Sequence, residues 1–245
     1  MTDLLQQLEL GDGIEQPVDQ WTLIGVKLVN WGTFSGYNAV PIHADGHMVT
    51  GESGSGKSTL LDAISSVIYH PKDLNFNAAA ESGSKRDRSD FTYVRGASSR
   101  GKNDDGVTTL RFARNGVTWS GIALTLNNPA QRKVTLVKAF RASASCADSS
   151  SLAKVSMVFD GEFDPRALAP FMDTKIDLVG IKNKLNPELA STDFKPFQER
   201  YLRIFGMKKE VLHLLQKVQS MQGVSSLDKL MQDFVLDDPT TFLDQ

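Results

Sequence analysis

The chain has 245 residues and a formal net charge of -2, with 40% hydrophobic and 23% charged residues, a composition typical of globular proteins. The near-neutral charge excludes a polycationic nucleic-acid binder, so any contact with DNA must come from a local basic patch. A single cysteine, Cys146, excludes an intrachain disulfide framework and a cysteine-based zinc site. This cysteine usage favours a cytoplasmic location, and the lack of an apolar run of about 18 residues argues against a membrane-spanning helix.

Strand-like and helical patterns alternate in the first third of the chain, after an acidic N-terminal arm predicted at 1–20. The β-branched run at 21–31 predicts a strand, and a second short strand is expected within 32–42. The apolar segment 47–50 predicts a third strand, which leads into a glycine-rich loop. From Lys57 onward the apolar residues recur at helical spacing, so a helix is predicted there, ending before a proline.

The middle of the chain has a different composition. Residues 72–106 are rich in Ser, Gly, Asn and charge, which predicts mostly loop, with 90–94 as a possible strand. Four strand-like runs separated by turn residues then predict an antiparallel meander, at 107–113, 117–126, 133–142 and 154–160. Beyond it, the pair Asp164–Pro165 is typical of a helix start. Amphipathic helices are predicted at 196–206, 208–219 and 225–239.

The glycine-rich loop GESGSGKS at 51–58 matches the Walker A pattern G-x-x-x-x-G-K-[ST]. Small residues let backbone N–H groups turn toward phosphate oxygens, and the following helix directs its positive end at the same anion. Lys57 is expected to act in catalysis by reaching the β- and γ-phosphates, and Ser58 to bind Mg²⁺. A chance match is the plainer alternative, but the predicted strand and helix on either side favour a site for ATP and Mg²⁺. The expected nucleotide-binding residues are Gly51, Glu52, Ser53, Gly54, Ser55, Gly56, Lys57, Ser58 and Thr59.

A catalytic carboxylate is harder to find. ATP hydrolysis requires an acidic residue that helps to hold Mg²⁺, and Asp160 follows a hydrophobic run. Asp160 precedes Gly161, however, and Asp-Gly is a strong hairpin signal, so a hairpin is favoured over a magnesium site. The segment NKLN at 183–186 lacks the carboxylate of a guanine-reading motif. The sequence therefore predicts a phosphate-binding loop that is half of a complete site.

Two segments, LVNWGTFSGYNAVPI and VTGESGSGKSTLLDAISSVIY, together resemble the start of an ATPase head of the SMC type, with VNW closest to the MukB branch. The later segments DRSDFTYVRGA and LLQKVQSMQGVSSLDKLMQDFVLDD resemble JetC, the family of SMC-like ATPases of the Wadjet anti-plasmid systems. The resemblance implies an α/β fold, that of a P-loop NTPase of the ABC/SMC head type. Residues 21–245 would form its N-terminal lobe, with a mixed sheet, an antiparallel meander and C-terminal helices, ending near the start of a coiled coil.

The resemblance also implies roles for single residues. Thr33 is placed near the phosphates, although Gly32 stands where the family usually has lysine. Gln222 is the expected Q-loop residue, which takes part in catalysis and contacts Mg²⁺, with Gln219 as the alternative; a pair of exposed helix-end glutamines is the competing interpretation. Arg95 matches an arginine that links DNA sensing to ATP in related heads, or else is an exposed arginine at a strand end.

A basic cluster around that arginine suits contacts with DNA phosphates. Interspersed acids make a solvated charged loop the plainer alternative. The expected DNA-contacting residues are Lys85, Arg86, Arg88, Arg95, Arg100 and Lys102. The four histidines lack the spacing of metal ligands.

By resemblance, the chain is the ATP-binding half of a motor ATPase that drives DNA loop extrusion in plasmid defence, inactive without its C-terminal lobe. The implied partners are that lobe, a second head in a dimer, a kleisin, small winged-helix subunits, a topoisomerase-like nuclease and double-stranded DNA, with no membrane. A self-contained P-loop kinase for a small molecule, with 82–90 as an arginine-bearing lid, is the alternative. A nucleotide-dependent assembly module without turnover is a third interpretation.

Overall fold

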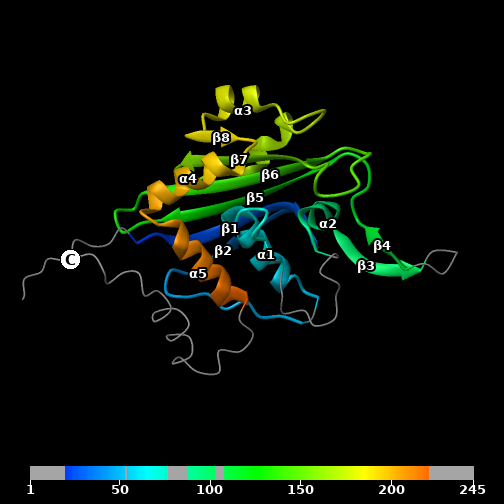
Figure 1. Ribbon diagram of the computed structural model, residues 1–245, viewed down its shortest axis with the longest axis horizontal. Coiled ribbons are helices and arrows are strands. Elements are labelled where there is room, and N and C mark those ends of the chain that lie inside the picture. The colour runs from blue at the N-terminus through cyan, green and yellow to red at the C-terminus, as the bar shows by residue number, and fades with distance from the viewer. Residues whose placement is uncertain (1–19, 53, 75, 77–87, 103–107, 221–245) are drawn as a thin grey trace, which may run out of the picture.

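The computed structural model describes residues 20–52, 54–74, 76, 88–102 and 108–220. A six-stranded sheet forms its centre, with strand order β2-β1-β5-β6-β7-β8 (Figure 1). These strands are β1 (Thr22–Trp31), β2 (Phe34–Pro41), β5 (Thr118–Asn127), β6 (Lys133–Ala142), β7 (Ala153–Asp160) and β8 (Leu189–Ser191). A separate two-stranded hairpin, β3 (Ala97–Lys102) and β4 (Thr108–Phe112), projects from the body.

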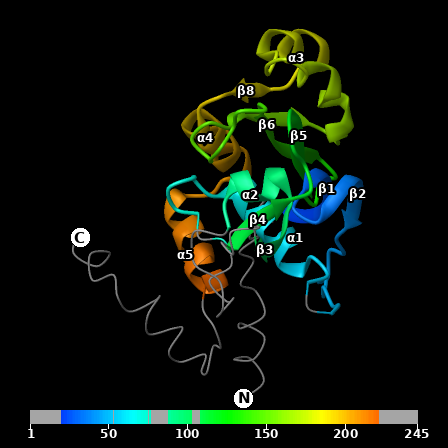
Figure 2. The same ribbon diagram turned by 90° about the vertical axis from the view of Figure 1, so that its right-hand side faces the viewer.

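Helices cover both faces of the sheet (Figures 1 and 2). One face carries α1 (Lys57–Ile68), α2 (Asp90–Arg95), α4 (Phe194–Phe205) and α5 (Lys209–Ser220). The other face carries the 3-10 helix η1 (Pro165–Phe171) and α3 (Leu178–Leu185). Alternation along β6 separates the two cores, because Leu136 and Phe140 pack on the α1 side whereas Val137 and Ala139 pack on the α3 side.

Most elements predicted from the sequence are present. Three of the four strands predicted for the meander form β5-β6-β7, but the first, at 107–113, is wrong as a meander strand because β4 pairs only with β3 in the separate hairpin. The helix that begins at Lys57 and the helices α4 and α5 lie close to their predicted bounds. The Asp164 side chain caps η1 by accepting a hydrogen bond from the Arg166 N–H, and Gly206 ends α4 in the left-handed conformation. The predicted helix at 225–239 and residues 1–19 of the predicted arm lie outside the described residues.

The prediction of a strand at 90–94 is wrong, because these residues form α2. Ser89 accepts a hydrogen bond from the Thr92 N–H at 3.2 Å, and Thr92 accepts one from the Ser89 N–H at 2.9 Å. This reciprocal capping box starts the helix despite its β-branched and aromatic composition. Gly96 then ends the helix in the left-handed conformation.

The predicted strand at 47–50 is also absent from the described sheets. A short apolar run forms a strand only where a partner satisfies its backbone groups, and here Met48 is 83% exposed. Without this strand, every pairing in the described sheet is antiparallel, so the expected mixed sheet is not observed. Among the described residues, no helix is long and apolar enough to cross a membrane.

Candidate nucleotide-binding site

The Walker A loop depends on glycine conformations. Gly51, Gly54 and Gly56 have φ angles of +155°, +85° and +99°, values that residues with a Cβ rarely adopt. A Cβ on Gly56 would lie 3.0 Å from Thr33 Oγ1 and 3.2 Å from a ring atom of Phe34. The loop therefore passes close to the end of β1 and can make this approach only because Gly56 has no side chain.

The Lys57 ammonium group lies over the loop that precedes it. Its Nζ donates hydrogen bonds to the carbonyls of Gly51 and Glu52, the latter at 2.6 Å. The helix α1 begins at Lys57, and its N-cap Gly56 provides no capping side chain. The first N–H groups of α1 and the positive end of its dipole therefore face the loop, which is the arrangement of an anion site.

The metal position predicted for Ser58 fits this geometry. Ser58 is the second residue of α1 and is half-buried, and its hydroxyl makes no hydrogen bond within the described chain. No group of three His, Cys, Asp or Glu residues in the described segments could hold a metal alone. Mg²⁺ would thus bind here together with the nucleotide phosphates, with Lys57 and the loop N–H groups holding the phosphates.

The structure places Thr33 beside the loop, next to Gly56, and its contact with the phosphates stays a prediction. The neighbouring Gly32 has a φ of +54°, and a Cβ on it would lie 2.5 Å from the Thr59 methyl carbon. A side chain at this position, such as the lysine expected from the resemblance, would collide with Thr59 of α1. Thr59 itself packs against Gly32, and its carbonyl accepts a hydrogen bond from the Trp31 indole at 3.2 Å. Thr59 thus joins the loop to β1.

A buried carboxylate behind the loop was missed from the sequence. Asp62 in α1 accepts a hydrogen bond from the Tyr93 hydroxyl and forms an ion pair with Arg88, whose Nη1 lies 3.8 Å from the carboxylate. Burial, and next the charge of Asp62, raise the pKa of Tyr93 above its usual value. Arg88 was expected to contact DNA, but its charge is directed at α1. No local pattern in the sequence marks Asp62, because helical spacing places it opposite the apolar residues Leu60, Ile64 and Val67.

A second buried network joins α1 to the sheet. Lys138 of β6 is 1% exposed, and its Nζ donates to the Ser66 carbonyl at 2.6 Å. The Ser66 hydroxyl donates to Asp90 at 3.0 Å, and Lys154 pairs with Asp90 at 3.8 Å. Burial lowers the pKa of Lys138. The signal in the sequence was Lys138 itself, a lysine inside an otherwise largely apolar predicted strand.

Arg95 is a structural residue in this chain. It is 4% exposed, and its guanidinium donates to the carbonyls of Gly116 at 2.5 Å, Ser143 at 2.7 Å and Cys146 at 3.2 Å. The expected DNA contact at Arg95 is therefore wrong, as is the alternative of an exposed arginine at a strand end. Arg95 ends α2 and joins it to the turn before β5 and to the loop between β6 and β7.

Asp160 lies far from the Walker A loop. In the sheet register, Asp160 lies opposite Val134, Val134 opposite Leu126, and Leu126 opposite Leu23 at the start of β1. The loop lies beyond Trp31, at the other end of β1. At about 3.3 Å per residue, these two ends are separated by about 25 Å. The Asp160 carboxylate instead pairs with Arg132 at 3.2 Å.

The hairpin predicted at Asp160–Gly161 is wrong, because the chain continues from β7 into η1 and not into a pairing strand. Gly161, with a φ of +87°, bends the chain toward η1, so only the choice against a magnesium site at Asp160 agrees with the structure. Several other predicted site residues lie outside the described residues, namely Ser53, Lys85, Arg86 and Gln222. The backbones of Gln219, Arg100 and Lys102 belong to α5 and β3, and their side chains lie outside the description.

Comparison with protein families bears on this site. Residues 23–83 match the family model of the P-loop containing region of AAA domain. The match covers β1 from its second residue, and all of β2, the Walker A loop and α1. The fold is that of an α/β P-loop NTPase. Proteins of this class bind a nucleotide with Mg²⁺ and act in general as nucleotide hydrolases or kinases. A comparison with curated proteins found no match.

Proposed function

We propose that this chain is the Walker A lobe of an SMC-like ATPase head of the MukB branch, related to JetC, and that it binds ATP and Mg²⁺. The observation that supports this proposal is a well-formed phosphate loop without a nearby catalytic carboxylate among the described residues. Asp160 is at the opposite end of the sheet, and Asp62 is engaged by Tyr93 and Arg88. In an SMC-type head, the missing acid is supplied by the C-terminal lobe.

The surface around the loop supports completion by another segment. Met48 is 83% exposed immediately before the loop, and Leu61 on α1 is 59% exposed. Exposed apolar side chains beside an incomplete site are typical of surfaces that a partner covers. In this proposal the partner is the C-terminal head lobe, and ATP then joins two completed heads into a dimer.

We infer the partners of the complete protein from its resemblance to the JetC family of SMC-like ATPases. The complete protein would act in the cytoplasm, away from membranes, with a kleisin, small winged-helix subunits and a topoisomerase-like nuclease. It would extrude loops of double-stranded plasmid DNA. Because Arg95 and Arg88 are engaged inside the lobe, the proposed DNA contacts are Lys85, Arg86, Arg100 and Lys102. The last two lie on the projecting β3–β4 hairpin, which also carries the exposed Arg111.

The test of nucleotide binding is Lys57→Ala, with the exposed Lys72→Ala as the matched control. Lys57 gives its charge to phosphates, so its loss should weaken ATP binding by about 100-fold in calorimetry. The control should keep wild-type affinity, and both variants should keep the wild-type melting temperature within about 2 °C. Unchanged ATP affinity in Lys57→Ala would contradict the proposal that the Walker A loop binds ATP.

The test of the incomplete head is turnover. The chain alone should hydrolyse ATP at background rate, because positioning and charge neutralisation by the second lobe are missing. Adding the C-terminal lobe should restore hydrolysis, with Ser58 and Gln222 then required for Mg²⁺-dependent activity. Turnover of several per second by the chain alone would favour the small-molecule kinase.

A further inference from the structure

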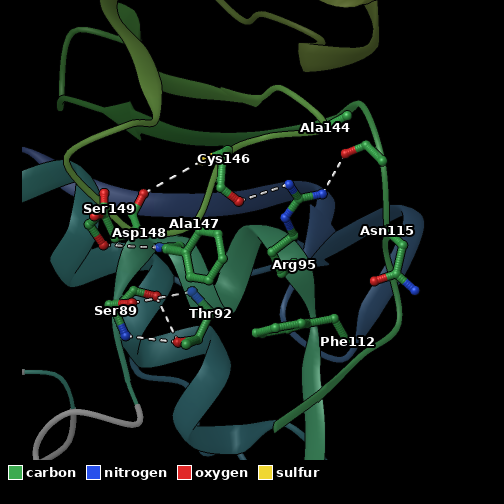
Figure 3. Close-up of a pocket in the computed structure, with 12 residues that line it drawn as sticks. Ser89, Thr92, Arg95, Phe112, Asn115, Ala144, Cys146, Ala147, Asp148 and Ser149 are labelled. Carbon is green, nitrogen blue, oxygen red and sulfur yellow. Dashed lines mark hydrogen bonds between the residues drawn. The ribbon is translucent and has the colours of Figure 1, made fainter.

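A second cavity lies beside α2, and none of the described residues that line it belongs to the Walker A loop (Figure 3). Its walls come from α2, the end of β4, the turn between β4 and β5, and the loop between β6 and β7. Its volume is about 800 Å³, within the range of small-molecule sites. Four segments of the chain therefore build one concave site that the nucleotide proposal does not use.

The cavity contains a buried positive charge. The Arg95 guanidinium lines it and is hydrogen-bonded to main-chain carbonyls through both Nη atoms (Figure 3). No described carboxylate forms an ion pair with Arg95. Buried charges are ordinarily balanced by an opposite charge, and the carbonyls satisfy the donors of Arg95 without neutralising it. The cavity therefore favours a ligand with a negative charge.

Two aromatic rings form the apolar part of the wall. Phe91 and Phe112 are half-buried, and their centroids are 5.5 Å apart at an interplanar angle of 75°. The Arg95 guanidinium carbon lies 5.8 Å from the Phe91 centroid. The cation and the rings thus lie next to one another, so a planar apolar group bound against the rings would place an attached anion near Arg95.

Two polar side chains further limit the charge of the ligand. The Asn115 amide lines the cavity and makes no hydrogen bond within the described chain, so it is free to donate to an anion. Asp148 also lines the cavity, and hydrogen bonds from Ser150 and Ser151 lower its pKa to about 2. Its permanent negative charge disfavours a dianion such as phosphate more than a monoanion.

We propose that this cavity binds a small aromatic carboxylate. The ring packs against Phe91 and Phe112, and the carboxylate lies in the field of Arg95, where the Asn115 amide donates to it. The Nη atoms of Arg95 are engaged by carbonyls, so recognition depends on its charge and on the rings rather than on a bidentate pair. This site is independent of the proposed nucleotide site.

The experiment compares four probes with the full chain by calorimetry. Phenylacetate carries a ring and one negative charge, phenethylamine a ring and a positive charge, acetate a charge without a ring, and phenyl phosphate a second negative charge. Phenylacetate is expected to bind at least about tenfold more tightly than each of the others. Equal binding of phenethylamine, or no saturable binding of phenylacetate, would overturn the proposal.

Variants locate the binding. Phe112→Ala and Asn115→Asp should each weaken phenylacetate about tenfold, by removing ring contact and by adding a negative charge. Val117→Ala is the control, because Val117 is 57% exposed in the turn next to Asn115 and does not line the cavity. Lys57→Ala should leave phenylacetate binding unchanged. Asn115 is exposed, so Asn115→Asp should fold and can be tested even if Phe112→Ala does not fold. Wild-type affinity of Asn115→Asp for phenylacetate would contradict the proposed binding site.

Discussion

The Tyr93 hydroxyl donates a hydrogen bond to the buried Asp62 carboxylate and so joins α2 to the helix that follows the phosphate loop. Two further contacts strengthen this connection. The Gly32 N–H donates to the Tyr93 carbonyl at 2.8 Å, and the Tyr93 ring stacks on Trp31 with centroids 4.9 Å apart. The end of β1, α1 and α2 are therefore held as one unit behind the Walker A loop.

Tyr93→Phe should lower the free energy of unfolding by about 1–2 kcal/mol, because a buried carboxylate loses one hydrogen-bond donor while the ring packing is kept. Urea denaturation measures this change. Tyr37→Phe is the control, since the Tyr37 hydroxyl on β2 makes no hydrogen bond within the described chain, and it should change stability by less than about 0.5 kcal/mol. Equal effects of the two variants would show that the bond to Asp62 contributes nothing.

Buried tyrosines also predict a loss of stability at alkaline pH. Burial raises the pKa of Tyr69 to about 12 and raises the pKa values of Tyr93 and Tyr201 as well. A folded-state pKa above the unfolded value of about 10 means that this stability is complete below pH 10 and is lost as the pH rises. Melting temperatures should therefore fall steeply between about pH 10 and 12. Absorbance titration of the Tyr37→Phe variant measures the three buried tyrosines alone, and phenolate that forms near pH 10 in this folded variant would contradict the account.

The sequence predicts the local structure of this chain better than its long-range contacts. A strand-like run bounded by turn residues identified β6 to the residue, and the Walker A spacing identified the loop and the start of α1, because both patterns are set by near neighbours. The prediction of a strand at 90–94 was wrong because the capping box at Ser89 outweighs the β propensity of these residues. The prediction that Arg95 contacts DNA was wrong because its carbonyl partners lie up to 51 residues away along the chain. Local sequence composition does not indicate such long-range contacts.

Gly56→Ala tests the close approach of the loop to β1. The new methyl group would meet Thr33 Oγ1 and the Phe34 ring in a backbone conformation that alanine rarely adopts. Gly36→Ala is the matched control, because Gly36 also has a positive φ, +67°, but nothing lies within 4 Å of its Cβ position. Gly36→Ala should cost only about 1 kcal/mol, the conformational penalty. Gly56→Ala should cost more and also weaken ATP binding at least about tenfold. Wild-type ATP affinity in Gly56→Ala would show that the nucleotide does not need this form of the loop.

The last prediction concerns DNA and the β3–β4 hairpin. If Arg100 and Lys102 each neutralise a phosphate, replacing both with Gln should reduce the slope of log affinity against log salt by about two units, with little dependence on DNA sequence. The control replaces Lys182 and Lys184 with Gln, since both are exposed on α3 across the sheet from α1 and α2. Fluorescence anisotropy with a labelled duplex at several salt concentrations measures the slope. ATP affinity should be unchanged in both variants, because the phosphate site at Lys57 is separate. A hairpin variant with the wild-type slope would show that these side chains are exposed to solvent without contacting DNA, and the DNA-binding surface would then have to lie elsewhere.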